Sequence, residues 1–109
     1  MIESTDVNPE DTDELTRQVQ LVKKIMKGEW ASVAQFKHIM VKSCKFRMNF
    51  VFILQMYRLN SKFQIEPDEL KPMIMLITEL LNTCHQHRDA FALKQIMVLM
   101  LTYYVIHKE

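Results

Sequence analysis

Glycine and proline are scarce in this chain, which has one glycine, Gly28, and three prolines among 109 residues. Sheet proteins usually need more of both residues at their turns, so this scarcity favours helices over strands. Two cysteines, Cys44 and Cys84, are too few for a disulfide framework, and we expect two reduced thiols. No signal peptide is recognisable, and no apolar run reaches the roughly 20 residues that span a bilayer. We therefore expect a soluble cytoplasmic protein.

The charged residues are unevenly distributed, although the net charge is only +1. Residues 1–14 carry six acids and no base, whereas residues 15–62 carry ten bases and one acid. The acidic start is polar and contains few apolar residues, which is typical of disorder. We expect residues 1–11 to form a disordered acidic lead and residues 12–109 to form a single helical domain, since this length suffices for one core.

The apolar stretch near the end of the chain is the feature around which the rest is expected to pack. Residues 88–107 contain no glycine or proline, and between residues 96 and 106 only Thr102 and the two tyrosine hydroxyls are polar. This composition predicts a helix over residues 89–107 that is buried on most sides. The expected fold is all-α, a single bundle of four to five helices around this buried C-terminal helix, with a core that includes Ile96, Leu99, Met100 and Tyr103.

Apolar residues recur at helical spacing in the first half of the chain. The spacing predicts a helix over about residues 13–27, which begins after Asp11 or Thr12 and ends at Gly28 as its C-terminal cap. A second helix is expected over residues 30–42, with a capping box from Ser32 and Gln35 if the helix starts at Ser32. The expected core positions of these two helices are Leu15, Val19, Val22, Met26, Trp30, Val33, Phe36 (or Ala34) and Met40.

One or two further helices are expected before the C-terminal one. Residues 45–59 are apolar over a wide arc, and either form a separate helix or continue the preceding one with a bend near Ser43. Because Pro72 lacks a backbone N–H, we expect a short turn at residues 67–71 and a helix over residues 72–85. Asp89 is then placed to cap the final helix. The expected stripes are Phe46, Phe50, Ile53, Leu54 and Tyr57, and Met73, Ile74, Ile77, Leu80, Leu81 and Cys84.

Few residues suggest catalysis or metal binding. Cys84, His85 and His87 are close in sequence, and Cys44 with His38 or His107 could complete a zinc site, but no motif with zinc-ligand spacing is present. Neighbouring helical positions point about 100° apart, so Cys84 and His85 would not form a nucleophile pair. No glycine-rich phosphate loop is present. We expect no enzyme activity, no cofactor and no metal.

Two other groups of residues suggest surfaces. The methionines at helical spacing are expected to fill the core, with Met48 and Met75 off the main stripes as candidates for an adaptable surface. A basic segment could meet anionic lipid head groups, whereas nucleic acid is not expected because the aromatic residues lie mostly at core positions. The candidate anion-binding or lipid-binding residues are Lys37, Lys42, Lys45, Arg47, Arg58 and Lys62.

One segment resembles a known family. Residues 80–97 (LLNTCHQHRDAFALKQIM), followed by Leu101-Thr102-Tyr103-Tyr104, are similar to the helical middle region of the set-binding factors, which are myotubularin-related pseudophosphatases with a DENN module. Residues 43–51 match the family only loosely, and the chain has no room for a DENN or phosphatase module. The resemblance implies a non-enzymatic helical module of proteins that act in endosomal traffic and Rab-type GTPase regulation. It implies no ligand residues.

These observations lead to two functional hypotheses. The first is a non-enzymatic protein–protein interaction module, in keeping with the missing catalytic groups and with the resemblance. The alternative is binding to an anionic membrane surface through the basic segment, since each lysine or arginine near such a surface contributes about 1 kcal/mol.

Overall fold

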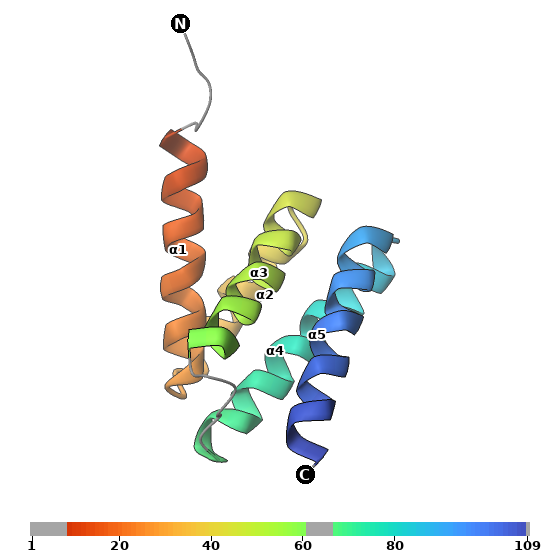
Figure 1. Cartoon of the computed structure of the whole chain (residues 1–109). Coiled ribbons are helices and arrows are strands. Elements are labelled where there is room, and N and C mark those ends of the chain that lie inside the picture. Colours follow the sequence, from red (N-terminus) through yellow and green to blue (C-terminus); the bar gives the residue numbers. More distant parts are fainter. Residues whose placement is uncertain (1–8, 61–66, 109) are drawn as a thin grey trace, which may run out of the picture.

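Five helices make up the part of the chain that the structure describes (Figure 1). The structure is a computed structural model, which describes the backbone of residues 9–60 and 67–108 and the side chains of residues 13–57 and 67–101. α1, α3 and α5 run in one direction and α2 and α4 in the other. The helices are α1 (Pro9–Met26), α2 (Ser32–Met40), α3 (Cys44–Asn60), α4 (Pro67–Gln86) and α5 (Ala90–Lys108). The all-α bundle expected from the sequence is confirmed.

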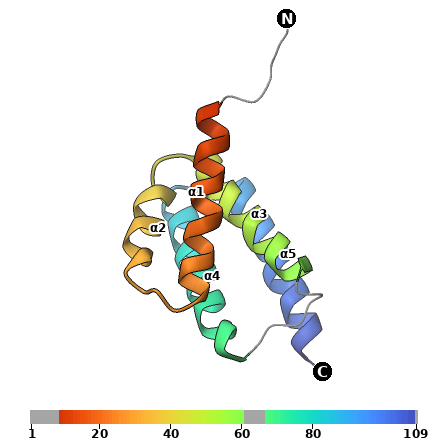
Figure 2. The same cartoon turned by 90° about the vertical axis from the view of Figure 1, so that its left-hand side faces the viewer.

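α3 and α4 hold the central positions in the bundle. Each of them contacts all four other helices, whereas α5 contacts only α3 and α4 within the described chain. Figure 2 shows α1 and α2 on the side of the molecule away from α5. α5 is therefore an edge helix, with one side against the bundle and the other directed outward.

The core is formed by the inner faces of all five helices. Phe36 of α2 and Phe50 of α3 are fully buried and meet edge to face, with ring centroids 4.6 Å apart. Such a pair contributes about 0.5–1.5 kcal/mol beyond its buried area. Polar groups join α1 to α3, because the buried Gln18 donates to the Phe46 carbonyl at 3.0 Å and accepts from Asn49 at 2.8 Å. This exchange satisfies the amide of a side chain that would otherwise be costly to bury.

The first helix is longer than expected. α1 begins at Pro9, so residues 9–11 of the expected acidic lead belong to the helix, while residues 1–8 lie outside the described residues. Proline is well suited to this position, since the first amide of a helix has no partner within it. Gly28 has φ +91°, and its amide donates to the Ile25 carbonyl at 2.9 Å, which confirms it as the residue that ends α1.

α2 and α3 are separate helices, which decides between the two alternatives for this region. The Phe46 amide donates to the Ser43 hydroxyl at 3.2 Å, so Ser43 caps the start of α3. The expected capping box of Ser32 and Gln35 is wrong, because the N-cap residue of α2 is Ala31 and no side-chain cap is made. Trp30 precedes α2 and is exposed rather than part of the core.

α4 is one continuous helix through Pro72, so the turn expected at residues 67–71 is wrong. Pro72 lies in the second turn, where its missing N–H leaves the Asp68 carbonyl without its usual partner. Its ring is buried, as are Met73 and Leu76 of the same helix. Of the expected stripe of this helix, Ile74 is instead exposed.

The burial expected for the C-terminal helix is also wrong. Ala92, Ile96 and Leu99 form a buried stripe on α5, but Met100 is 41% exposed, and the side chain of Tyr103 lies outside the described residues. The stripe is narrow because only α3 and α4 pack against α5. An apolar helix thus lies at the edge of the bundle.

Candidate functional site

Arg47 does not belong to a basic surface, contrary to its place in the expected patch. Its side chain is 7% exposed, and its Nε lies 2.8 Å from Oδ2 of Asp89, whose side chain is 8% exposed. Arg47 Nη1 also donates to the Met40 carbonyl at 2.9 Å. The guanidinium therefore joins the end of α2, the start of α3 and the start of α5. It is a structural cation, because a buried charge must be paired and hydrogen-bonded.

The helical spacing of Arg47 relative to apolar residues of α3 indicates that its side chain is buried. Arg47 lies four residues before Val51 and seven before Leu54, which places the three side chains on one face of α3. Val51 and Leu54 are both buried. An arginine within an apolar stripe indicates a buried ion pair, but its partner lies 42 residues away and could not be identified from spacing.

The segment that resembles the set-binding factors forms the turn between α4 and α5. The Asp89 amide donates to the Cys84 carbonyl at 2.9 Å, and Arg88 has φ +54°, as expected at the left-handed end of a helix. Asp89 Oδ1 accepts from the Ala92 amide at 3.3 Å, which confirms Asp89 as the cap of α5. Several residues that carry the resemblance thus have structural roles.

The cysteine and histidines near this turn do not converge. Cys84 is buried, whereas His85, His87 and Cys44 are exposed. Burial, together with the Asp89 carboxylate and partly offset by Arg47, raises the pKa of the Cys84 thiol to about 11. The thiol is therefore protonated at neutral pH and is a poor nucleophile. Within residues 13–57 and 67–101, no three histidine, cysteine or acidic side chains are grouped as a metal site requires, and the side chain of His107 lies outside this range.

The other basic candidates are distributed over two helices and the turn between them. Lys37 of α2 is exposed and lies 3.6 Å from Glu79 of α4, so part of its charge is compensated. Lys42 is exposed at the α2–α3 turn, and Lys45 is exposed on α3. Lys62 and the side chain of Arg58 lie outside the described residues. Among the expected basic residues whose side chains are described, Lys37, Lys42 and Lys45 are therefore exposed, whereas Arg47 is buried.

The two methionines singled out from the sequence are not the most exposed ones. Met48 and Met75 are partly buried and pack against the core. Met56, Met97 and Met100 are exposed, and all three lie on α3 or α5. The methionines available for an adaptable surface therefore lie on these two helices.

α5 carries more exposed large apolar side chains than any other described helix. Phe91 is 64% exposed, Met97 60% and Leu101 63%, and Val98 is also exposed. With a step of 100° per residue these four and Lys94 occupy an arc of about 120°, opposite the buried stripe of Ala92, Ile96 and Leu99. We call Phe91, Lys94, Met97, Val98 and Leu101 the α5 outer face.

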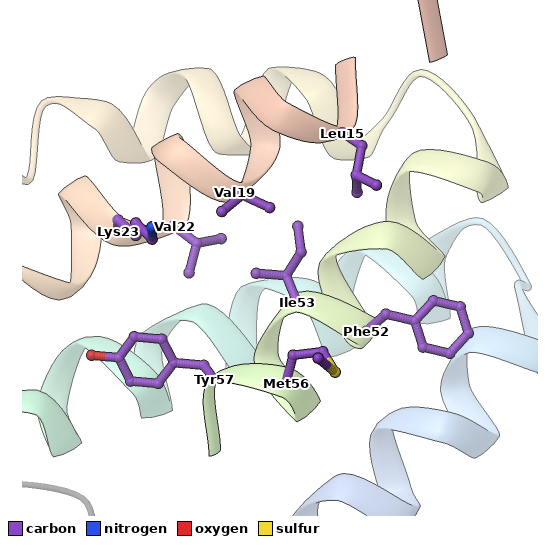
Figure 3. A pocket seen from close by; sticks show the side chains of 8 residues that line it. All are labelled: Leu15, Val19, Val22, Lys23, Phe52, Ile53, Met56 and Tyr57. Atoms are coloured by element: carbon purple, nitrogen blue, oxygen red, sulfur yellow. The ribbon is translucent and has the colours of Figure 1, made fainter. Parts of the chain in front are cut away.

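The second apolar feature is a groove of about 320 Å³ between α1 and α3 (Figure 3). α1 and α3 run in the same direction, so successive turns of the two helices face each other along the groove. Leu15 and Phe52 lie at one end, and Lys23 and Tyr57 lie at the other. The lining residues, which we call the α1–α3 groove, are Leu15, Val19, Val22, Lys23, Phe52, Ile53, Met56 and Tyr57.

Among the described residues, Lys23 is the one charged residue in the lining of this groove. Tyr57 lines the same end, and its hydroxyl donates to Glu69 of α4. Burial and this carboxylate raise the pKa of Tyr57 to about 12, so the phenol stays neutral. The groove therefore presents an apolar channel with an ammonium at one end.

Sequence reasoning assigned part of this groove to the core. Leu15 begins the apolar stripe of α1, yet it is 42% exposed, whereas Val22 and Ile25 in the later turns of the helix are buried. Phe52 and Met56 are four residues apart on α3 and lie away from its buried stripe. The four-residue spacing of Phe52 and Met56 is typical of one helix face, and indicates a second apolar face on α3 that is directed outward.

Comparisons with other proteins do not assign this chain to a family. A scan against protein-family models gives no match, and neither the curated proteins nor the solved structures give one. None of the described helices combines the length and apolar character that crossing a bilayer requires. The α5 outer face and the α1–α3 groove are therefore the features that bear on function.

Proposed function

We propose that this protein is a non-enzymatic helical interaction module whose α5 outer face docks against an amphipathic helix of another protein. The observation that supports this most strongly is the exposure of Phe91, Met97 and Leu101 on an edge helix. Exposed single apolar residues are common, but a contiguous stripe on one helix is characteristic of an interaction site.

The size of the α5 outer face is appropriate for the core of such an interface. A half-exposed aromatic or long aliphatic side chain leaves on the order of 100 Å² in water, so four such residues expose several hundred Å². A standard interface covers about 800 Å² on each partner, and its polar rim supplies the remainder. The face is thus large enough to anchor one helix but needs flanking contacts.

The charge on the face indicates the chemistry of the partner. Lys94 is the only charged residue within the α5 outer face and lies one turn before Met97 and Val98. A helix that packs its apolar side on this stripe would place its own flanking residues near Lys94. We therefore expect an acidic residue beside the apolar anchors of the partner helix, since unlike charges at the rim aid association and specificity.

Membrane traffic is the cellular setting that we propose for this module, in an endosomal or Rab pathway. The support is the similarity of residues 80–104 to the set-binding factors. That segment includes the α4–α5 turn and the described part of the α5 outer face.

Binding to an anionic membrane surface is the second proposal. Lys42 and Lys45 are exposed, and the exposed Val41 lies next to them at the α2–α3 turn. With Lys37 near Glu79 and Arg47 buried, fewer charges than expected can contribute. At about 1 kcal/mol for each lysine near an anionic surface, the remaining residues support only weak, salt-sensitive binding.

The test of the interaction proposal uses the full chain and one pair of surface substitutions. Met97→Glu/Leu101→Glu places two carboxylates on the α5 outer face, and Ile74→Glu is the control, because Ile74 is an exposed apolar residue of α4. Each variant is used as bait in cell extract, and zero-length cross-linking then joins Lys94 to any adjacent carboxylate. We expect wild type and Ile74→Glu to retain a stoichiometric partner, cross-linked through Lys94, that the double variant loses.

Three results would contradict this proposal. Equal capture by the double variant would show that the α5 outer face is not the docking surface. Self-association of wild type in sedimentation, abolished in the double variant, would assign the face to a second copy of the chain. Co-sedimentation with anionic vesicles, lost in Lys37→Glu/Lys45→Glu but retained in the double variant, would favour the membrane proposal instead.

A further inference from the structure

The α1–α3 groove has the characteristics of a small-ligand site. Its volume of about 320 Å³ is within the range of known ligand pockets, which are mostly apolar with a few polar groups that fix orientation. Val19 and Val22 line it from α1, and Ile53 and Met56 line it from α3, as Figure 3 shows. The groove is a separate surface from the α5 outer face, since α1 and α5 are not in contact.

The dimensions of the groove suit an extended hydrocarbon chain. Leu15 and Lys23 are eight residues apart on α1, which corresponds to about 12 Å along the helix axis. A saturated chain of medium length extended from Lys23 toward Leu15 would contact apolar side chains along its whole path. A docked helix is about 10–12 Å across with its side chains, and a groove of about 320 Å³ is too small to take up such a helix.

The charge at that end favours an anionic head group over a neutral one by a small factor. Lys27 lies one turn beyond Lys23, because its amide donates to the Lys23 carbonyl at 3.2 Å, and it adds a second positive charge. Glu69, which accepts from the Tyr57 hydroxyl, and the C-terminal ends of α1 and α3 partly oppose an anion. Because Lys23 is exposed, its ion pair would be worth at most about fivefold in affinity.

We propose that the α1–α3 groove binds a single-chain fatty carboxylate, with the chain along Val19 and Ile53 and the carboxylate at Lys23. Most of the affinity comes from the chain, since each buried methylene contributes about fourfold. This activity goes beyond the proposed docking function, because it requires neither α5 nor a partner protein.

The test is calorimetric titration of the full chain with octanoate, decanoate and dodecanoate below their micellar concentrations. Decanol and decyltrimethylammonium serve as neutral and cationic probes of equal chain length. Lys23→Gln removes the ammonium, and Lys24→Gln is the matched control, since Lys24 is the adjacent exposed lysine and does not line the groove. Val19→Phe fills the groove, and its folding is checked by thermal melting.

We expect affinity to rise about fourfold for each methylene until the groove is filled. Decanoate should bind several-fold more tightly than decyltrimethylammonium, and Lys23→Gln should weaken decanoate, but not decanol, by up to about fivefold. Lys24→Gln and Met97→Glu/Leu101→Glu should bind as wild type, so this result is independent of the docking proposal. A folded Val19→Phe should bind no probe.

Several outcomes would overturn the proposal. No heat with any probe would exclude the site, and undiminished binding to a folded Val19→Phe would place the ligand elsewhere. If that variant does not fold, the lysine comparison decides, because equal losses in Lys23→Gln and Lys24→Gln would show non-specific attraction. Binding of the cationic probe as tightly as decanoate would contradict the role of Lys23.

Discussion

Asp89→Ala is expected to destabilise the protein by about 3–5 kcal/mol, the usual cost of leaving one member of a buried ion pair without its partner. The substitution removes the carboxylate that lies 2.8 Å from the buried Arg47 guanidinium. It also removes the cap of α5, because Asp89 Oδ1 accepts from the Ala92 amide. A domain of this size has only about 5–15 kcal/mol of stability, so a large fraction would be lost.

Urea unfolding followed by circular dichroism measures this effect, and two further variants separate its causes. Asp89→Ser keeps a good helix cap but removes the charge, so it should lose most of what Asp89→Ala loses. In Arg47→Met/Asp89→Ser both charges are absent, and stability should recover toward wild type, as it does when a whole buried pair is replaced. An Asp89→Ala protein within about 1 kcal/mol of wild type would refute a structural role for the pair.

Leu99→Asp should unfold the domain, whereas the same substitution at Leu101 should change stability by less than about 1 kcal/mol. The two leucines are two residues apart on α5, and Leu99 is 2% exposed while Leu101 is 63% exposed. An aspartate at position 99 would be an unpaired charge among buried aliphatic side chains. An aspartate at position 101 would remain in water.

Thermal melting compares the two variants directly, since both replace a leucine with an aspartate. Leu99→Asp should show no cooperative transition and reduced helical circular dichroism. Leu101→Asp should melt within a few degrees of wild type, because about 1 kcal/mol shifts the midpoint of a 100-residue domain by roughly 4–8 °C. Unfolding of both variants would show that the whole circumference of α5 is buried.

The helices themselves could be predicted because their signals are local. The apolar spacing and Gly28 identify α1 and its end. Asp89 was likewise recognised as the cap of α5. The expected start of α4 at Pro72 was wrong, because the helix continues through this buried proline despite the one hydrogen bond that its missing N–H costs.

The surfaces could not be predicted, because they depend on which helices are neighbours. α5 is apolar almost all round, and such a helix is usually central. Its edge position follows from contacts with α3 and α4 alone. Arg47 was assigned to the surface as a charged residue, although its true partner, Asp89, is distant in sequence. The α1–α3 groove exists because Leu15 and Phe52 remain partly uncovered, which no pattern within one helix specifies.

Methionine oxidation measures the exposure of the α5 outer face in the unmodified protein. Met97 is 60% exposed, whereas Met40 and Met73 are almost completely buried. Dilute peroxide oxidises a buried thioether only when the structure opens, so its rate follows the small open population. Peptide mass spectrometry of the native, dilute chain should show Met97 oxidised at least roughly ten times faster than Met40 and Met73. Equal protection of Met97 would mean that the α5 outer face is covered in the free chain, which would contradict the account.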